Sequence, residues 1–453
     1  MLKTHLKQIS FGVLAIALIV TTAACGNGDK AASGDQKQGA EPKKKVTHLN
    51  FWGAIPPETG PQELVDAWNK AHPDIQVTYT RFVNDDSGNT KLEAALLAGN
   101  VDVYINYAWE TMQKRISSKL LEPLDPFLDK ENFNLEENFG KHPYETGGKR
   151  YFMPTLGGSN AFIMYNKNMT DAANIKIPDK WTWDDYMKIA KQLTKGEGNN
   201  KIYGSIEATA GYHWASPAQT LLNGDYTYKE GKPESNFDDP AFLKSLQIRY
   251  QMENIDQSQV PLIEMKASKM DMSSEFTKGH VAMINNYNSL LRDIRDPEKN
   301  PHDFVTAFAP MPTLTPEQSE VWSGGLREWI SMSPQASNKE AAYQFLKYYA
   351  TDGYYPMINS VRIPAWKKAN TDDITKYFLG DKREKLFDLD SFKKYVLNNP
   401  MHRNLDRVRT EGAAKILQIM TEESEKALLK EQSVDDAIKN MKKKSDDAIK
   451  SGK

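Results

Sequence analysis

The chain has 453 residues but only one cysteine, Cys25, so it cannot form an internal disulfide. It also lacks the residue spacings that mark common catalytic and metal sites. Its eight histidines form no HExxH pattern or other metal-ligand spacing, and the sequence contains neither a GxxxxGKS/T phosphate loop nor a GxSxG nucleophile elbow. We therefore expect a protein that is not an enzyme, with no catalytic residue, no cofactor and no metal site.

An excess of charge of one sign is missing as well. Lysine and arginine number 58, aspartate and glutamate 60, and the formal net charge is −2 at pH 7. This balance does not favour a nucleic acid partner. Apolar residues make up 39% of the chain and aromatic residues 10%, which is enough for sizeable cores. Roughly 400 residues follow Val46, and this length exceeds that of one ordinary domain. We therefore expect two domains.

The N-terminus has the pattern of an export signal. Lys3 and Lys7 precede residues 11–20, which are all apolar or small. Ten residues make about 15 Å of helix, half of a bilayer core of about 30 Å, so they are typical of a signal peptide and not of a membrane span. The tripeptide Thr-Ala-Ala then leads into Cys25, which resembles the bacterial lipobox although threonine stands where leucine is usual.

We therefore predict a lipoprotein signal peptide over residues 1–24 and lipidation of Cys25, with an ordinary secretory signal and an incidental cysteine as the alternative. Residues 26–45 contain no large apolar side chain, so they cannot bury enough surface to offset the entropy of ordering. Residues 25–45 are thus predicted to be a lipid anchor and a disordered tether with a reach of about 25 Å. Two acyl chains would hold the protein stably at a membrane.

Strands and helices alternate in the first part of the body. Residues 47–52 have the pattern of a buried strand, and Pro61 suits the first position of a helix that ends before Pro73. The next expected elements are a strand over 75–79, a helix over 91–98 and a strand over 101–105. This order predicts a parallel sheet covered by helices.

Helices dominate the later part of the chain. A capping box and an apolar stripe predict a helix over 183–194. Ser337 and Glu340 repeat the capping pattern before another helix, and residues 410–450 predict two amphipathic helices that divide near residue 432.

Six segments carry a resemblance to a known family. They are LNFWGAIPPETGPQELVDAWNKAHPDIQVTY, KLEAALLAGNVDVYINYAWETMQKRISSKLLEPLDPFL, YFMPTLGGSNAFIMYNKNM, WTWDDYMKIAKQLT, FTKGHVAMINNYNSL and WSGGLREWISMSPQASNKEAAYQFLKYYA. In this order they resemble the extracellular solute-binding proteins of ABC importers, specifically the carbohydrate-type group that includes maltose-binding protein. The resemblance covers nearly the whole mature chain.

The resemblance implies an α/β, two-lobed periplasmic-binding-protein fold with hinge strands and a ligand in the interlobe cleft. It implies a first lobe formed by residues 46–157 and 326–375 and a second lobe formed by residues 158–325 and 376–453. Ligands of open α/β sheets bind beyond the carboxyl ends of the strands, where the connecting loops lie. Ligand-binding side chains are therefore expected in these loops and crossovers.

The loops and crossovers combine aromatic, amide and charged side chains. Flat aromatic faces suit sugar rings, while amides and charged groups can bind sugar hydroxyls. The predicted ligand-binding residues are Trp52, Asn106, Trp109, Glu110, Asn160, Trp214, Asn286, Tyr287, Trp322, Arg327, Glu328, His402 and Arg403. His402 and Arg403 rest on the resemblance alone. Trp109 and Trp214 stand in polar, loop-like contexts without apolar periodicity.

Some of these residues also fit structural roles. Trp52 could fill the core at a strand end, and Asn106 and Asn286 could bond turn backbone. Arg327 and Glu328 could bind an acidic group of the ligand or form an ion pair. Neutral and uronate-containing oligosaccharides therefore both stay open. Trp68 and Trp329 are predicted to pack in the core.

Together these features predict a lipid-anchored monomer on the extracellular face of the cell membrane. It would capture a sugar or oligosaccharide by lobe closure and deliver it to an ABC permease. A secreted glycoside hydrolase, with two carboxyl groups about 5 to 9.5 Å apart, is one rival class. A lipoprotein sensor that binds a non-sugar ligand is the other.

Overall fold

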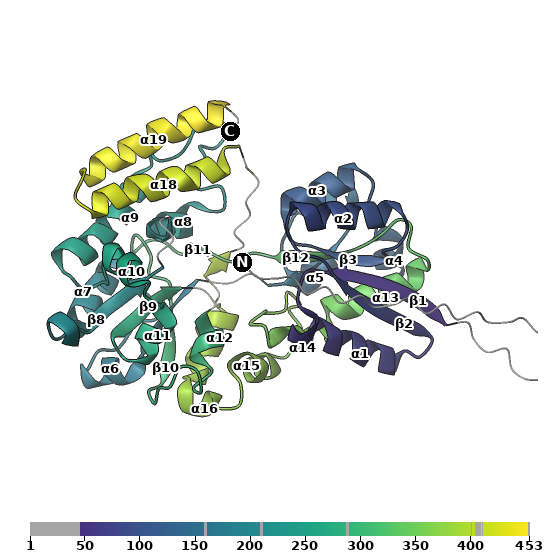
Figure 1. Ribbon diagram of the computed structural model, residues 1–453, viewed down its shortest axis with the longest axis horizontal. Coiled ribbons are helices and arrows are strands. Elements are labelled where there is room, and N and C mark those ends of the chain that lie inside the picture. The colour runs from purple at the N-terminus through teal and green to yellow at the C-terminus, as the bar shows by residue number, and fades with distance from the viewer. Residues whose placement is uncertain are drawn as a thin grey trace, which may run out of the picture. The chain divides into compact units, whose positions relative to one another are not determined.

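The computed structural model describes residues 46–157, 161–208, 212–286, 290–399, 401–403, 409 and 411–451. The signal peptide and the tether predicted for residues 1–45 lie outside the described residues. The described chain forms two main sheets, each with its own helices and hydrophobic clusters (Figure 1). We call the part around the first sheet lobe 1 and the part around the second sheet lobe 2.

The sheet of lobe 1 has five strands in the order β2-β1-β3-β12-β6. Its strands are β1 (Thr47–Gly53), β2 (Ile75–Arg81), β3 (Val103–Asn106), β6 (Met153–Leu156) and β12 (Arg327–Met332). Strand β1 pairs in parallel with β2 and β3, as the sequence predicted, whereas β12 runs antiparallel to β3 and β6. A separate hairpin joins β4 (Glu145–Thr146) and β5 (Lys149–Arg150).

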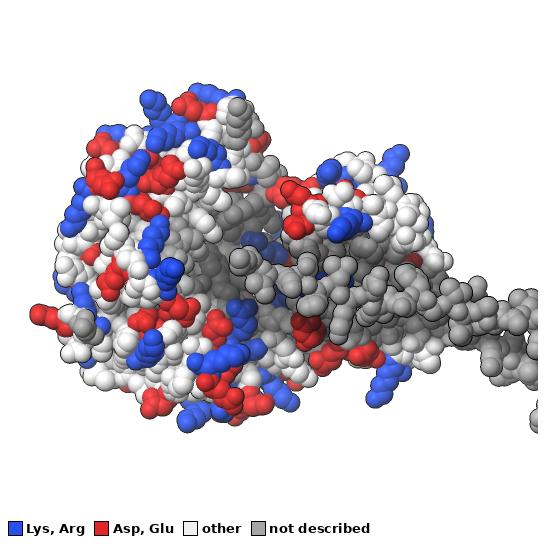
Figure 2. Space-filling view, viewed as in Figure 1, with Lys and Arg blue, Asp and Glu red and all other residues white. Residues whose placement is uncertain are grey.

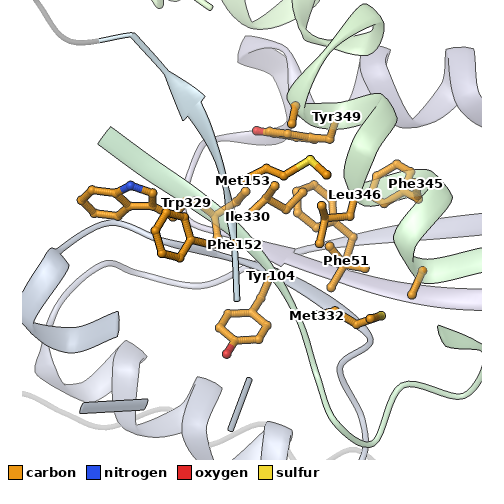
Figure 3. Packing of buried hydrophobic residues seen from close by; sticks show 14 of the residues in the cluster. Phe51, Tyr104, Phe152, Met153, Trp329, Ile330, Met332, Phe345, Leu346 and Tyr349 are labelled. Carbon is orange, nitrogen blue, oxygen red and sulfur yellow. The ribbon is translucent and has the colours of Figure 1, made fainter. Parts of the chain in front are cut away.

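Helices cover both faces of this sheet. They are α1 (Pro61–Ala71), α2 (Asp86–Leu97), α3 (Trp109–Ser117), α4 (Asp125–Lys130), α5 (Leu135–Phe139) and α13 (Lys339–Ala350), with short 3-10 turns at η1 (Pro57–Thr59) and η6 (Asp352–Tyr354). Trp68 of α1 and Phe345 of α13 make an edge contact at 5.4 Å between ring centroids, and Phe345 and Tyr349 also contact Phe51 of β1. Figure 3 shows Phe51, Phe345 and Tyr349 within the same cluster.

Local hydrogen bonds decide where the helices begin. α2 begins five residues before the predicted start because the Asp85 carboxylate accepts the Gly88 N–H at 2.7 Å. α7 (Trp183–Leu193) has the predicted capping box. The predicted cap at Ser337 is wrong by one residue: Asn338 accepts the Ala341 N–H at 3.1 Å, while Ser337 binds Asp102.

The sheet of lobe 2 has four strands in the order β10-β7-β9-β8. They are β7 (Phe162–Asn166), β8 (Tyr203–Glu207), β9 (Val281–Asn286) and β10 (Thr306–Pro310), and a two-stranded pair joins β11 (Val321–Trp322) and β13 (His402–Arg403). β8 and β9 are parallel, and β7 is antiparallel to both β9 and β10. The carboxyl ends of β8 and β9 and the start of β7 therefore lie at one edge.

The remaining helices accompany lobe 2 or lead into it. They are α6 (Lys167–Ala172), α8 (Ser216–Leu222), α9 (Pro240–Tyr250), α10 (Leu262–Ser268), α11 (Met272–Thr277), α12 (Leu291–Ile294), α14 (Tyr355–Ile358), α15 (Thr371–Leu379), α16 (Arg383–Leu386), α17 (Leu389–Ser391), α18 (Ala413–Leu428) and α19 (Val434–Ser451). Short turns of 3-10 or π type are η2 (Gly198–Asn200), η3 (His213–Ala215), η4 (Gln251–Ile255) and η7 (Phe392–Leu397). The division between α18 and α19 confirms the two predicted C-terminal helices.

The chain passes from the lobe 1 cluster to a lobe 2 cluster between α14 and α15. Met357 of α14 and Ala365 after it belong to the lobe 1 cluster, although Ile358 belongs to a lobe 2 cluster. The predicted boundary at residue 375 falls inside α15, whose Ile374 and Phe378 both lie in the same lobe 2 cluster. We therefore propose a boundary between α14 and α15.

Candidate ligand-binding site

The register of the lobe 1 sheet gathers several predicted residues at one edge. Phe51 pairs with Val103, Trp329 with Asn106 and Arg327 with Leu156. The carboxyl ends of β1, β3 and β6 and the start of the antiparallel β12 therefore share this edge. Loops at such an edge are where ligands of α/β sheets bind. The predicted residues at or next to this edge are Trp52, Asn106, Trp109, Glu110, Arg327 and Glu328.

Asn106 is a buried link between strands and helices. Its Nδ2 donates to Ser331 Oγ at 3.1 Å, and its Oδ1 accepts from Arg115 Nη1 at 2.9 Å. The Asn106 side chain is fully buried and that of Arg115 is 1% exposed. This geometry supports the structural role for Asn106 that the sequence left open, since its amide is already bonded on both sides.

Trp109 forms the centre of an aromatic group at the start of α3. Its ring lies 5.4 Å from that of Trp329 and 5.8 Å from that of Phe152, in edge contacts. Figure 3 shows Trp329 and Phe152 beside each other at one end of the lobe 1 cluster, and Trp329 is buried as predicted. Trp52 and Trp109 are both only partly buried, and Glu110 is exposed in the first turn of α3. Part of each tryptophan surface is therefore open to solvent.

Arg327 and Glu328 have different surroundings. Arg327 is exposed, whereas Glu328 is buried and forms an ion pair with Arg362 Nη1. Burial raises the pKa of the Glu328 carboxyl, and the neighbouring Arg362 charge opposes that rise. Glu328 also has a left-handed backbone with φ of 57°. Such a conformation is costly for a residue other than glycine and is typical of constrained functional regions.

A buried ionic cluster lies at the matching edge of lobe 2. Glu207 ends β8, and its Oε1 accepts from Asn285 Nδ2 of β9 at 3.0 Å. Arg249 of α9 places Nη1 3.2 Å from Glu207 Oε2, and its Nε donates to Glu253 Oε1 at 2.6 Å. The side chains of Arg249, Glu207 and Glu253 are 3%, 9% and 3% exposed. Burial raises the pKa of the Glu207 carboxyl, and the neighbouring Arg249 charge opposes this rise.

Trp214, predicted to bind ligand from a polar, loop-like context, is buried. It lies in η3 just before α8, is 1% exposed and packs in a lobe 2 cluster with Phe242. The cluster joins neighbours such as Ala218 to residues of α9 and α18 that are distant in the sequence, so no local periodicity predicted it. The structure therefore supports a packing role for Trp214.

Trp322, His402 and Arg403 lie together. β11 and β13 pair in parallel, and Trp322 stands opposite Arg403 in the register. Arg403 Nη2 contacts the Glu320 carboxylate at 2.9 Å, and Trp322 is partly buried. Burial lowers the pKa of His402 to about 4, so its ring is neutral at pH 7. These two late residues were expected from the resemblance alone, and the structure shows them beside the crossover.

Asn160, Tyr287 and Cys25 lie outside the described residues, and of Asn286 only the backbone in β9 is described. Within the described residues no group of three or more histidine, cysteine, aspartate or glutamate side chains could hold a metal ion. A hollow of about 630 Å³ on lobe 2, lined by residues such as Tyr165, Asp179 and Lys394, contains none of the predicted residues.

The sequence reasoning missed Glu207, Arg249 and Arg362. Arg249 and Arg362 reach carboxylates that are 42 and 34 residues away, and neither arginine lies in a recognisable motif. Glu207 ends the strand β8, which the sequence analysis did not predict, and a buried carboxylate calls for a partner of opposite charge. The partner itself was visible only in three dimensions.

Comparison with known proteins gives consistent results. The family model for bacterial extracellular solute-binding proteins matches residues 55–356. A maltotriose-binding protein from Pyrococcus abyssi is 23% identical over 314 residues, which cover 66% of this chain and 64% of that protein. An arabinooligosaccharide-binding protein from Halalkalibacterium halodurans is 28% identical over 178 residues, 36% of each chain. The chain thus spans less than two thirds of the length of these relatives.

Solved structures with a similar fold extend over more of the chain. A sugar transporter from Rhizobium etli in an open conformation gives a TM-score of 0.70 at 17% identity, covering 89% of this chain and 99% of the other. An ABC substrate-binding protein from Listeria monocytogenes in complex with cycloalternan gives a TM-score of 0.63 at 21% identity, covering 90% and 99%. At such identities these likenesses speak to the fold alone.

Proposed function

This chain belongs to the bacterial extracellular solute-binding protein family, and we propose that it captures a sugar or oligosaccharide between its lobes and delivers it to an ABC permease. Its structural neighbours confirm the predicted α/β, two-lobed periplasmic-binding-protein fold. The observation that carries the proposal is that partly buried tryptophans lie beside polar side chains at the carboxyl-end edge of the lobe 1 sheet and in the β11–β13 pair. Trp52, Trp109 and Trp322 contribute the aromatic surfaces.

The chemistry of these edges suits sugars. An aromatic face can pack against the C–H face of a pyranose ring, and neighbouring amide and charged groups can bind its hydroxyls. Glu110 and Arg327 are exposed at the lobe 1 edge, and Arg403 is exposed beside Trp322. The maltotriose-binding and arabinooligosaccharide-binding relatives, both named for oligosaccharides, give the proposal further support.

Lobe closure is the proposed mechanism. A ligand that contacts both lobes binds the closed form more tightly than the open form, and it therefore stabilises the closed form. Two crossovers, from β6 to β7 and from β11 to β12, join the lobes, and Gly324 and Gly325 in the second crossover have φ of 74° and 116°. A third connection runs through the segment between α14 and α15, where Arg362 binds Glu328. These connections are the proposed hinge.

The remaining parts of the proposal concern location. Lipidation at Cys25 and the tether over residues 26–45 would keep the sugar-binding body beside the importer, on the extracellular face of the membrane. In the described part of the chain, no helix has the length and hydropathy needed to cross a bilayer. We also propose that the protein acts as a monomer and binds its ligand without cleaving it, in keeping with a family of solute-binding proteins.

A sugar panel tests the function directly. Purified protein is screened by thermal shift against plant and bacterial oligosaccharides, and hits are measured by calorimetry and small-angle scattering. We expect at least one glycan to bind and to reduce the radius of gyration through closure. Trp322→Ala should weaken binding about tenfold or more. Tyr203→Ala is the matched control, because Tyr203 begins β8 at the opposite edge of its sheet.

Two outcomes would contradict the proposal. Binding of peptides or ions with no response to any glycan would favour the sensor alternative. New reducing ends after incubation with an oligosaccharide would favour a glycoside hydrolase.

A further inference from the structure

Four arginines near the two sheet edges, Arg115, Arg249, Arg362 and Arg403, already have carboxylate partners. At lobe 1, Arg362 is paired with Glu328, and the buried Arg115 lies 3.3 Å from Glu93. Arg403 beside Trp322 contacts Glu320. A guanidinium fork that holds a carboxylate of its own protein is poorly suited to bind a second carboxylate from a ligand.

The buried cluster of lobe 2 has two carboxylates and only one arginine. Arg249 lies between Glu207 and Glu253, and all three side chains are at least nine-tenths buried. Glu253 alone balances Arg249, so the cluster has no net positive charge whether or not Glu207 is ionised. The nearby His213 ring adds no charge at pH 7, because burial lowers its pKa to about 4.

Donors for an uncharged ligand are nevertheless present. Apart from the ion pair with Glu207, Nη1 and Nη2 of Arg249 have no hydrogen-bond acceptor among the described residues. An N–H group left without an acceptor in a buried place calls for an oxygen from water or from a ligand hydroxyl. A hydroxyl satisfies this need without adding a third negative charge.

The other exposed charges at the lobe 1 edge are balanced too. Arg81 at the end of β2 donates from Nε to the Ala54 carbonyl oxygen at 3.2 Å, and the exposed Asp85 and Asp86 follow it at the start of α2. At lobe 1 the exposed Glu110 carboxylate offsets the exposed Arg327, and Arg327 already has an interaction of its own. By sequence, residues 158–160, 209–211 and 287–289 carry no charged side chain, and residues 404–408 carry one of each sign.

We propose that the site takes an uncharged sugar and rejects uronates, and that the Glu207–Arg249–Glu253 cluster is a determinant of this selectivity. The proposal rests on the proposed function, because it assumes a sugar at these edges. It decides between the neutral and acidic ligands that the sequence left open. The physical reason is that a ligand carboxylate would lose its hydration beside a group of charges that offers no net attraction.

Matched sugar pairs test the proposal. Each uronate-containing oligosaccharide is compared by calorimetry with its carboxyl-reduced form, which keeps the stereochemistry and the linkage but lacks the charge. We expect the reduced form to bind about tenfold or more tightly than the acid. Equal or tighter binding of the acid would overturn the inference and leave the sugar-binding function intact. If no neutral or acidic sugar binds, the proposed function itself fails.

Two variants locate the source of the selectivity. Glu207→Gln keeps an acceptor for Asn285 and removes a carboxylate from Arg249, so it should reduce the preference for the neutral sugar several-fold. Glu264→Gln is the matched control, because Glu264 accepts the Tyr203 hydroxyl at the opposite edge of the same sheet. An unchanged preference in a folded Glu207→Gln protein would show that the cluster does not set it. If this variant fails to fold, the comparison of acidic and carboxyl-reduced sugars on the wild-type protein still tests the proposal.

Discussion

Tryptophans of this chain take different roles that depend on their partners. Trp68 and Trp214 are 2% and 1% exposed and serve as packing, whereas Trp52, Trp109 and Trp322 are only partly buried at the sheet edges. The local sequence predicted the position of Trp68, which lies on an amphipathic helix. It did not predict the burial of Trp214, because Phe242 of α9 and other members of its cluster, such as Ile416 of α18, are distant in the sequence.

We predict that Trp214→Ala destabilises the protein strongly. Removing a fully buried tryptophan leaves a cavity, which costs about 3 to 5 kcal/mol in the free energy of unfolding. Urea unfolding followed by circular dichroism measures this loss. Trp322→Ala is the control and should cost much less, since Trp322 is partly exposed. A Trp214→Ala protein as stable as the wild type would contradict the packing role of Trp214.

Among the helices, the C-terminal pair shows how one buried charge can hold two elements together. Glu423 of α18 is 1% exposed and accepts from Lys426 at 2.8 Å, from Lys444 of α19 at 2.7 Å and from Gln432 at 2.9 Å. Burial alone would raise the pKa of Glu423, but these three donors outweigh it and lower the pKa to about 2. Figure 1 shows α18 and α19 side by side along their lengths.

The lowered pKa predicts an acid-dependent loss of stability. An ordinary glutamate has a pKa near 4.3 in the unfolded chain, so the Glu423 contribution is complete above that value and is lost as the pH falls towards 2. Glu423→Gln should therefore be less stable than the wild type at pH 6, and the difference should shrink by pH 2.5. Urea unfolding across this range checks the prediction against Glu422→Gln, an exposed neighbour. A difference that does not change with pH would refute the ionic role of Glu423.

Over the whole molecule, the two signs of charge are nearly balanced. Figure 2 shows lysine and arginine interspersed with aspartate and glutamate over the visible face, in keeping with the near-zero net charge. The described residues of this face form no large patch of one sign that would draw the body onto an anionic bilayer. Attachment would then depend on the lipid at Cys25.

This dependence yields a simple prediction. Cys25→Ser should release the protein from the membrane fraction into the medium, because the attachment site for lipid is lost. Fractionation and immunoblotting of the producing cells measure the distribution. Thr22→Leu, which restores the usual lipobox residue, should leave the protein in the membrane fraction. Membrane retention of Cys25→Ser would show that the export signal is not a lipoprotein signal.

Much of the fold follows from the sequence alone. The strand at 47–52, the helix that begins at Pro61 and the two C-terminal helices depend on apolar periodicity and on capping, which act between neighbours in the chain. The order of these elements also carried the family resemblance. The first residues of the helices were predicted less accurately, as at Asp85 and Asn338. The reason is that several nearby side chains compete to cap the same N–H groups.

The composition of the site was decided by the tertiary structure. Asn106 is bonded to Arg115 and Ser331, Glu328 to Arg362, and Glu207 to Arg249, and none of these pairs is adjacent in the sequence. The sequence by itself determined the first strands and helices, the two C-terminal helices and their order, because these depend on neighbours in the chain. Only the folded sheets decided which polar groups are already paired and which remain for a ligand, because burial and charge pairing depend on residues that the fold brings together from distant parts of the chain.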